Sequence, residues 1–160
     1  MTTSAELQAL LDRLSGAAIA GDAAAFAACF TPDAIYHDYI YGDHRGRADI
    51  ERMLKDYFLR DAKDYRWNFF DAVCDGDKGY AWSLSAFTST VPEFAGRPVL
   101  IDGMSRFRLE RGLIAEYWES VNGGIAMAQL GVAPARMAKV FEKWAGWLKA
   151  RPEVRRYLAS

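Results

Sequence analysis

The period of the hydrophobic pattern changes near Tyr65, and this change constrains the fold more than any other feature of the sequence. Before Tyr65, apolar residues recur every three or four positions, as on one face of a helix. After Tyr65, apolar and polar residues alternate over long runs, as in strands with one buried face. Helices that are followed by a run of strands, rather than interleaved with them, indicate an α+β domain.

The first third of the chain is predicted to hold three helices. Thr3 and Glu6 have the spacing of a capping box, so the first helix should begin there and end at Gly21. Asp22 can cap a shorter second helix that Pro32 ends. A third helical stripe follows, made of Ile50, Met53, Leu54, Tyr57 and Phe58.

Between the second and third helices the sequence predicts a short extended run over residues 34–39 and a loop over 42–46. Four longer strands then follow, separated by glycine-containing turns. They cover residues 66–74, 80–91, 99–109 and 113–121.

Helical sequence returns near Gly123, and Pro134 suits the first turn of a last, amphipathic helix. The chain of 160 residues contains no internal repeat and no linker, so we expect a single domain over residues 1–160. Its core should cover residues 5–131, and residues 132–160 should form a C-terminal helical extension.

Composition and charge exclude several classes of partner. With 20 basic and 21 acidic residues, the net charge of -1 gives no basic excess for binding nucleic acid. No apolar run approaches the roughly 18 residues of a membrane span, and the N-terminus lacks the pattern of a signal peptide. The isolated Cys29 and Cys74 fit the reducing cytoplasm, where we expect the protein to reside.

A metal site is not expected. His37, Asp38, Asp43 and His44 could be imagined as ligands, but alternation along a strand points His37 away from Asp38. No third imidazole or thiolate lies nearby in the sequence. The sequence also lacks a glycine-rich phosphate loop and a dinucleotide motif, so we expect no cofactor.

Three stretches, in this order and spacing, resemble the nuclear transport factor 2-like superfamily. They are residues 30–38, the hairpin 106–114, and residues 116–131 with the sequence Glu-Tyr-Trp at the start and Gln-Leu-Gly at the end. The resemblance is strongest to the SnoaL-like and ketosteroid isomerase-like branches and covers roughly residues 5–131. It implies a cone-shaped domain, usually a homodimer, in which a curved antiparallel sheet wraps around N-terminal helices and encloses a small-molecule pocket.

Asp38 falls where ketosteroid isomerase-like members carry their general base. Burial of a carboxylate in an apolar pocket raises its pKa, which suits it to moving protons near neutral pH. Tyr36 should share the face of Asp38 because side chains alternate along a strand. The alternative is structural: aspartate is common before turns, and Asp38 could simply cap the loop that follows.

Other positions depart from the isomerase pattern that the resemblance implies. The tyrosine that donates a hydrogen bond to the oxyanion matches Leu14, and a supporting tyrosine matches Leu54. The protonated acid maps nearest to Gly103. Steroid isomerisation is therefore not expected, since stabilisation of the developing charge usually supplies the largest rate term.

The pairing of the last two strands decides which of their residues face the pocket. Pairing Leu109 with Ile114 predicts that Trp118 and Asn122 face inward. Residues on the opposite face would be Asp102, Glu119 and Val121. A slip by one residue would exchange the two faces. In SnoaL-like cyclases the catalytic aspartate falls at Asn122, and an amide can form hydrogen bonds but cannot act as the base.

These observations favour a cofactor-independent enzyme of the isomerase, lyase or cyclase type. Its substrate would be a hydrophobic, carbonyl-bearing small molecule, with Asp38 as the general base. The expected substrate contacts are Tyr36, Leu54, Phe58, Trp82, Trp118 and Asn122. The alternative is a non-catalytic ligand-binding or dimerisation module of the same fold.

Overall fold

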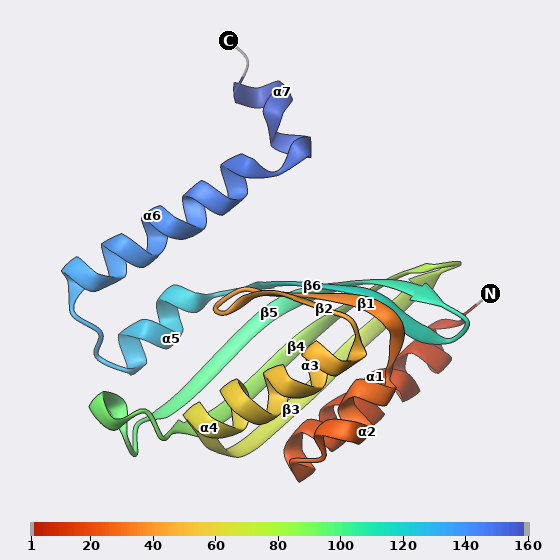
Figure 1. The fold of residues 1–160 in the computed structure, drawn as a ribbon, viewed down its shortest axis with the longest axis horizontal. Coiled ribbons are helices and arrows are strands. Elements are labelled where there is room, and N and C mark those ends of the chain that lie inside the picture. The colour runs from red at the N-terminus through yellow and green to blue at the C-terminus, as the bar shows by residue number, and fades with distance from the viewer. Residues whose placement is uncertain (1, 159–160) are drawn as a thin grey trace.

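A computed structural model describes residues 2–158 as a curved, unclosed sheet of six strands with helices packed on one face (Figure 1). The strand order is β2-β1-β6-β5-β4-β3, and all neighbours are antiparallel except β1 and β6, which run parallel. The strands are β1 (Phe30–Asp38), β2 (Gly42–Arg45), β3 (Ala62–Asp75), β4 (Lys78–Ser89), β5 (Pro98–Glu110) and β6 (Leu113–Val121). This is the α+β cone that the sequence predicts.

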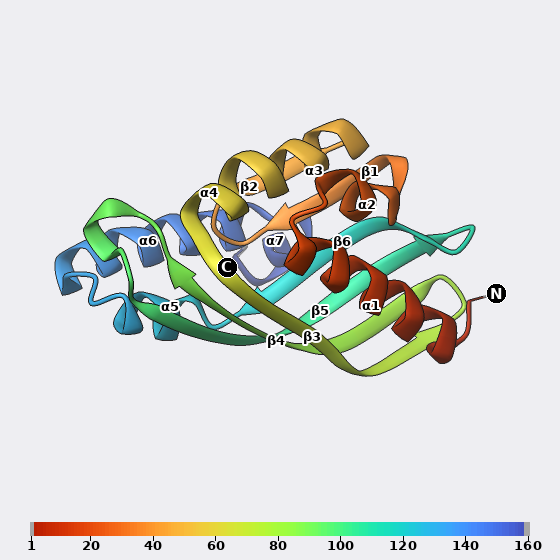
Figure 2. The same ribbon diagram turned by 90° about the horizontal axis from the view of Figure 1, so that it is seen from below.

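The helices before β3 cover the inner face of the sheet (Figure 2). They are α1 (Ser4–Ala20), α2 (Ala23–Ala28), α3 (Arg47–Met53), the π-helical turn η1 (Leu54–Phe58) and α4 (Leu59–Asp61). The later helical segments are η2 (Pro92–Phe94), α5 (Gly123–Gln129), α6 (Pro134–Ala150), η3 (Pro152–Val154) and α7 (Arg155–Leu158). Within the described residues, no helix combines the length and apolar character needed to cross a membrane.

The predicted start and end of α1 are confirmed. Glu6 N–H donates to Thr3 Oγ1 at 3.2 Å, and Thr3 N–H donates to Glu6 Oε2 at 2.7 Å, so the capping box forms in both directions. Gly21 ends the helix with a φ of 71°. Two boundaries differ from expectation: β1 begins before Pro32, and residues 42–45 form β2 rather than a loop, because they pair with the end of β1.

The core lies between α1–α3 and the inner face of the sheet. α1 buries its whole leucine stripe, Leu7, Leu10, Leu11 and Leu14, each at most 1% exposed. Full burial of one such side chain stabilises the fold by about 1.5–3 kcal/mol, so burial of this stripe strongly favours packing of α1 against the sheet. Opposite it, large rings fill the inner face: Trp67, Phe69, Phe107 and Tyr117.

The predicted register of β5 and β6 is wrong by one residue. Arg108 pairs with Glu116 while Leu109 pairs with Ile114, so β6 carries one extra residue, Ala115, at a bulge. Beyond the bulge the two faces of β6 are exchanged relative to the prediction. Glu119 therefore points inward, opposite Ser105, and Trp118 lies on the outer face.

The face predicted for Trp82 is also wrong. Residues of β4 alternate as expected, but Ala81 and Ser83 are buried and Trp82 is 37% exposed on the outer face. The small side chains face the core because Phe69 of the neighbouring strand lies directly beside Ser83 and fills the space on the inner face. Trp82 packs on Phe70 instead, with ring centroids 4.9 Å apart.

Candidate functional site

The structure brings two carboxyl groups together inside the cone, on neighbouring strands. In the parallel pairing of β1 with β6, Tyr36 lies beside Tyr117 and His37 beside Trp118. The next step along both strands places Asp38 next to Glu119 on the inner face, close enough for their side chains to share a hydrogen bond. Glu119 is a residue that the sequence analysis assigned to the wrong face.

Asp38 is only 6% exposed and is held by the turn that follows it. Its Oδ1 accepts hydrogen bonds from Ile40 N–H at 2.8 Å and Tyr41 N–H at 2.5 Å. Asp38 therefore does cap the β1–β2 turn, as the structural alternative expects, and it also lies beside a second carboxyl group. Burial raises the pKa of Asp38, while the bonds from Tyr41 and Ile40 and the nearby His44 oppose that rise.

Glu119 is fixed by two donors from different elements. Its Oε1 accepts from Tyr39 N–H at 3.2 Å, and its Oε2 accepts from the Tyr117 hydroxyl at 3.2 Å. The Tyr117 hydroxyl also lies 3.1 Å from Ser105 Oγ. Burial, and then the negative charge of Asp38, raise the pKa of Glu119 to about 8. At neutral pH Glu119 therefore keeps its proton.

Two buried polar atoms lie near this pair: Tyr36 Oη, which is beside the Tyr117 hydroxyl, and His44 Nε2, which has no hydrogen-bond partner among the described residues. Tyr36 shares the inner face with Asp38, as alternation predicts, and its ring lies 4.3 Å from that of Tyr117. His44 lies opposite Tyr36 on β2, with Nδ1 3.5 Å from Asp49 Oδ2. Because buried polar groups are nearly always paired, the unpaired His44 Nε2 beside a carboxyl pair marks a candidate place for a ligand.

An aromatic wall lies near Asp38, whose carboxylate accepts a hydrogen bond from the Tyr41 N–H. Tyr41 stacks on Tyr57 at 5.2 Å and lies 5.9 Å from Phe58, and these three side chains are only partly covered. Tyr57 and Phe58 come from η1, and π-helical turns occur frequently at functional sites. On the other side, Tyr65 faces Phe87 at 5.6 Å. The wall offers flat apolar surfaces next to the polar pair.

The remaining predicted contacts divide into three groups. Phe58 lies in the aromatic wall, whereas Leu54 is 1% exposed and belongs to the closed core. Trp82 and Trp118 lie outside the cone, where Trp118 stacks on His37 with ring centroids 5.0 Å apart. Asn122 is exposed and caps α5, because its Oδ1 accepts from Ile125 N–H at 3.3 Å. The last three therefore do not face the carboxyl pair.

The position that maps to the protonated acid of ketosteroid isomerase-like enzymes has no room for a side chain. A Cβ on Gly103 would lie 2.6 Å from the backbone oxygen of Ser120. Asp102, next to it, is exposed on the outer face. The neutral acid inside this cone is instead Glu119, on the adjacent strand.

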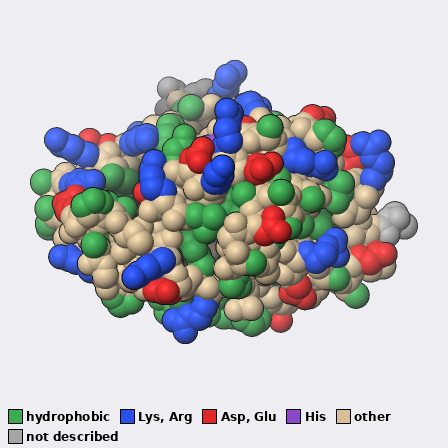
Figure 3. All heavy atoms as spheres, turned by 60° about the horizontal axis from the view of Figure 1, so that its bottom comes forward, with side chains coloured by type: hydrophobic (Ala, Val, Ile, Leu, Met, Phe, Trp, Pro, Cys, Tyr) green, Lys and Arg blue, Asp and Glu red, His purple; other side chains and the backbone are tan. Residues whose placement is uncertain are grey.

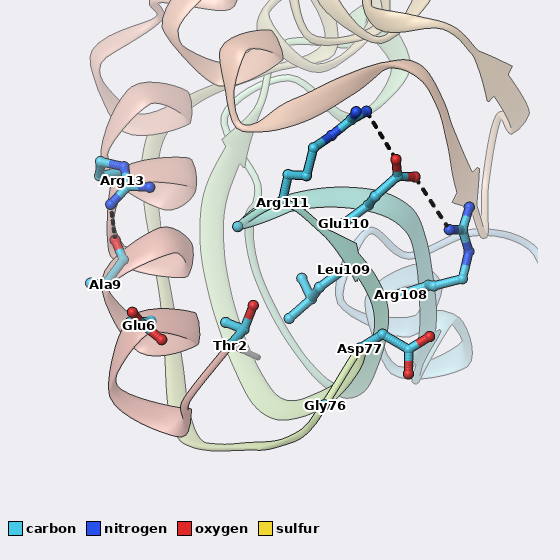
Figure 4. Close-up of a pocket in the computed structure, with 11 residues that line it drawn as sticks. Thr2, Glu6, Ala9, Arg13, Gly76, Asp77, Arg108, Leu109, Glu110 and Arg111 are labelled. Carbon is cyan, nitrogen blue, oxygen red and sulfur yellow. Dashed lines mark hydrogen bonds and ion pairs between the residues drawn. The ribbon is translucent and has the colours of Figure 1, made fainter.

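A wide surface hollow of about 1010 Å³ lies between α1, the β3–β4 turn and the β5–β6 turn (Figure 4). Its charged side chains include Arg108 and Arg111, which are 46% and 79% exposed and both pair with Glu110. Exposed ion pairs of this kind contribute little energy and hold no fixed geometry. We therefore assign the candidate site to the carboxyl pair rather than to this hollow. Among residues 2–158, no cluster of three or more histidine, cysteine or acidic side chains is arranged to hold a metal ion.

Solved structures share this fold at low sequence identity. TsrD from Streptomyces laurentii aligns with a TM-score of 0.72 and 21% identity over 83% of this chain and 100% of its own. IdmH from Streptomyces antibioticus, a candidate polyketide cyclase, aligns with a TM-score of 0.65 and 23% identity over 78% and 97%. An LEH-like epoxide hydrolase of M. tuberculosis aligns with a TM-score of 0.65 and 13% identity over 79% and 90%.

A search of curated proteins gave no match. The sequence pattern of the SnoaL-like domain, however, matches residues 8–117, which is more than half of the chain. These residues run from α1 through the bulge of β6 to Tyr117, the neighbour of Glu119. The chain belongs to the SnoaL-like domain family.

Proposed function

We propose that this protein is a cofactor-independent enzyme that binds a hydrophobic, carbonyl-bearing small molecule and transforms it by proton transfer. The observation that carries the proposal is the Asp38–Glu119 pair, in which Asp38 is buried and Glu119 is partly exposed, near an aromatic wall. Asp38 would act as the general base and Glu119 as the acid. The reaction would be an isomerisation, an elimination or a cyclisation, in keeping with the candidate cyclase among the structural neighbours.

In the proposed first step the two carboxyl groups have different roles. Ionised Asp38 takes a proton from the carbon next to the substrate carbonyl, and the C–H electron pair forms a carbon–carbon double bond. The carbonyl oxygen gains negative charge, and neutral Glu119 donates a hydrogen bond or its proton to that oxygen. The enol then collapses in one of three ways. Protonation at another carbon isomerises the substrate, loss of a leaving group completes an elimination, and attack on a second carbonyl closes a ring.

A second candidate function, a non-catalytic ligand-binding module, is favoured by one observation. Asp38 Oδ1 already accepts two backbone hydrogen bonds from the β1–β2 turn, which is a sufficient structural reason for an aspartate here. A ligand-binding module would use the same aromatic wall and the unpaired His44 Nε2 without transferring a proton.

Deuterium exchange distinguishes the two functions without knowledge of the natural substrate. We expect the protein, in deuterated buffer, to accelerate exchange at the carbon next to the carbonyl in at least one of a panel of hydrophobic, enolisable ketones. The acceleration should be roughly 10²–10⁴-fold over buffer, the usual contribution of a general base. Proton NMR measures the exchange, and ligand-induced shifts of the protein signals report binding. Binding without exchange across the panel would favour the ligand-binding module.

We further propose that the protein is a homodimer in the cytoplasm. Several large apolar side chains are exposed on the outer face of the sheet: Phe70, Val73, Tyr80, Trp82, Leu100 and Met104. A patch of this kind usually marks a protein interface. Both cysteines in the described residues are free, which fits a reducing compartment. Light scattering should give twice the 17.9 kDa of one chain at micromolar concentration, and a value near 17.9 kDa would contradict the dimer.

The helix-covered face of the molecule does not favour binding of nucleic acid. On the face shown in Figure 3, basic and acidic side chains are interspersed with apolar ones. Binding of nucleic acid relies on a basic surface that neutralises phosphates, so we propose a small molecule rather than nucleic acid as the ligand.

A further inference from the structure

Three consecutive backbone N–H groups hold both carboxyl groups of the pair. They belong to Tyr39, Ile40 and Tyr41, the residues of the turn between β1 and β2. Tyr39 N–H donates to Glu119 Oε1 at 3.2 Å, and the next two donate to Asp38 Oδ1 at 2.8 and 2.5 Å. The position of this turn therefore determines how the two carboxyl groups lie relative to each other.

The turn lies at the surface, so its position depends on what packs against its two ends. Ile40, at its centre, is 48% exposed. At one end, the Tyr41 hydroxyl donates to Asp61 Oδ2 at 2.7 Å, and the Tyr41 ring stacks on Tyr57. These contacts attach Tyr41 to α4 and η1. Tyr39, at the other end, contacts a different part of the chain.

The C-terminal helix α6 makes this second contact through Trp144. The ring centroids of Trp144 and Tyr39 lie 4.6 Å apart, so the two rings pack directly. The same indole lies on the backbone of the buried Gly123, where a Cβ would come within 2.4 Å of Trp144 Cη2. α5 begins at Gly123, just after β6 ends at Val121. Trp144 therefore bridges the ends of β1 and β6, the two strands that carry the carboxyl pair.

Two consecutive glycines let α6 approach the body this closely. Phe141, three residues before Trp144 on the same face of α6, lies against Gly124, where a Cβ would be 3.2 Å from its ring. Both rings belong to the apolar stripe predicted for this helix. α6 lies outside residues 8–117, which match the SnoaL-like domain, so the C-terminal extension provides this contact.

We propose that Trp144 is a positioning residue: through Tyr39 it holds the β1–β2 turn, and thereby the carboxyl pair, in the arrangement that proton transfer needs. Without the indole, Tyr39 loses this support and the turn moves more freely. Misplacement of a reacting group by about 1 Å can slow a reaction about 10²-fold. The catalytic consequence rests on the proposed function, whereas the hold on the turn can be measured without a substrate.

Hydrogen exchange of the turn amides tests this hold directly. In Trp144→Ala, the amides of residues 39–41 should exchange at least about tenfold faster than in wild type, while amides in β4 keep their rates, as measured by NMR. Trp147→Ala is the matched control, because it makes the same truncation on the same helix at a side chain that is 40% exposed. Unchanged exchange of the three amides in Trp144→Ala, or an equal gain in Trp147→Ala, would overturn the proposal.

Kinetics connect the hold on the turn to the proposed reaction. With a ketone that the wild type deuterates, Trp144→Ala should lower kcat roughly 10²-fold and change KM less than about threefold, because the indole supports the carboxyl pair rather than the substrate. Trp144→Phe keeps a ring against Tyr39 and should recover most of this loss. A raised KM with unchanged kcat would overturn the positioning role. If even the wild type exchanges no ketone, the proposed function fails, and faster exchange of the turn amides in Trp144→Ala would still support the hold.

A further variant displaces the indole without removing it. The new methyl group of Gly123→Ala would overlap Trp144 Cη2, so the ring has to shift, and the turn amides and kcat should change as in Trp144→Ala. Gly146→Ala is the control, because a Cβ there meets nothing within 4 Å. Circular dichroism checks that each variant is folded. In the double variant of Gly123→Ala and Trp144→Ala, the effects should not add, and full additivity would overturn the proposal.

Discussion

Asp38→Asn should lower turnover roughly 10²–10⁴-fold while leaving the protein folded. The asparagine Oδ1 can still accept the hydrogen bonds from Ile40 and Tyr41, so the β1–β2 turn keeps its cap. The amide cannot take a proton, however, and the base is lost. The rate of deuterium exchange, or of turnover once a substrate is known, measures the effect, and thermal unfolding should show stability equal to or above that of wild type.

Two further variants separate the catalytic role of Asp38 from its role in the turn. Asp38→Ala removes both, so it should lose activity and also destabilise the fold by roughly 0.5–2 kcal/mol, by analogy with helix caps. Asp102→Asn is the matched control, because Asp102 is exposed on the outer face of β5. Asp102→Asn should change neither turnover nor stability. Undiminished turnover in Asp38→Asn would remove the assigned base and favour the ligand-binding module.

The carboxyl pair, Asp38 and Glu119, shows how far a sequence can predict this site. Period-two alternation on β1 correctly placed Tyr36 and Asp38 on the inner face, because this strand has no bulge between them and Ala34. Glu119 was missed because the bulge at Ala115 shifts β6 by one residue. A signal was present: Leu113, Ile114 and Ala115 are three consecutive apolar residues, which interrupt alternation, and Ile114 and Ala115 are both buried.

The choice of face on β4 could not be made from alternation alone. Period two separates Trp82 from Ala81 and Ser83, but it does not say which set faces the core. Hydrophobicity favours burial of the tryptophan, and the structure reverses this because rings from β3 and β5 already occupy the inside. An exposed apolar patch of this kind is typical of a protein interface, which is the reason to expect a partner there.

The second large effect expected is on stability as a function of pH, through Glu119. Its pKa of about 8 in the folded protein exceeds the ordinary 4.5, so the folded state keeps a proton that the unfolded chain releases. Below about pH 4.5 both states hold the proton and Glu119 costs nothing. As pH rises from 4.5 to 8, stability should fall, because in this range the unfolded chain loses the Glu119 proton and the folded protein keeps it. At about 1.36 kcal/mol per pH unit, the loss has an upper bound of about 5 kcal/mol.

Glu119→Gln should remove most of this pH dependence. Glutamine stays neutral: its Oε1 can still accept from Tyr39 N–H, and its amide nitrogen can donate to the Tyr117 hydroxyl oxygen, so the variant should be more stable than wild type above pH 8. Asp38, whose pKa is also raised, contributes a slope of the same sign that begins near its ordinary 3.8 and should persist. Urea unfolding at a series of pH values measures both slopes. Glu116→Gln, on the outer face of the same strand, is the control, and an equal slope in Glu119→Gln and wild type would contradict the assignment.

The two residues can also be tested against each other. The negative charge of Asp38 is one of the causes that raise the pKa of Glu119. Asp38→Asn removes that charge, so the pKa of Glu119 should fall below about 8, and carbon-13 NMR of the glutamate side chain would follow it. An unchanged titration of Glu119 in Asp38→Asn would mean that burial alone sets its pKa. The two carboxyl groups would then be neighbours without being a functional pair, and the acid–base mechanism would lose its physical basis.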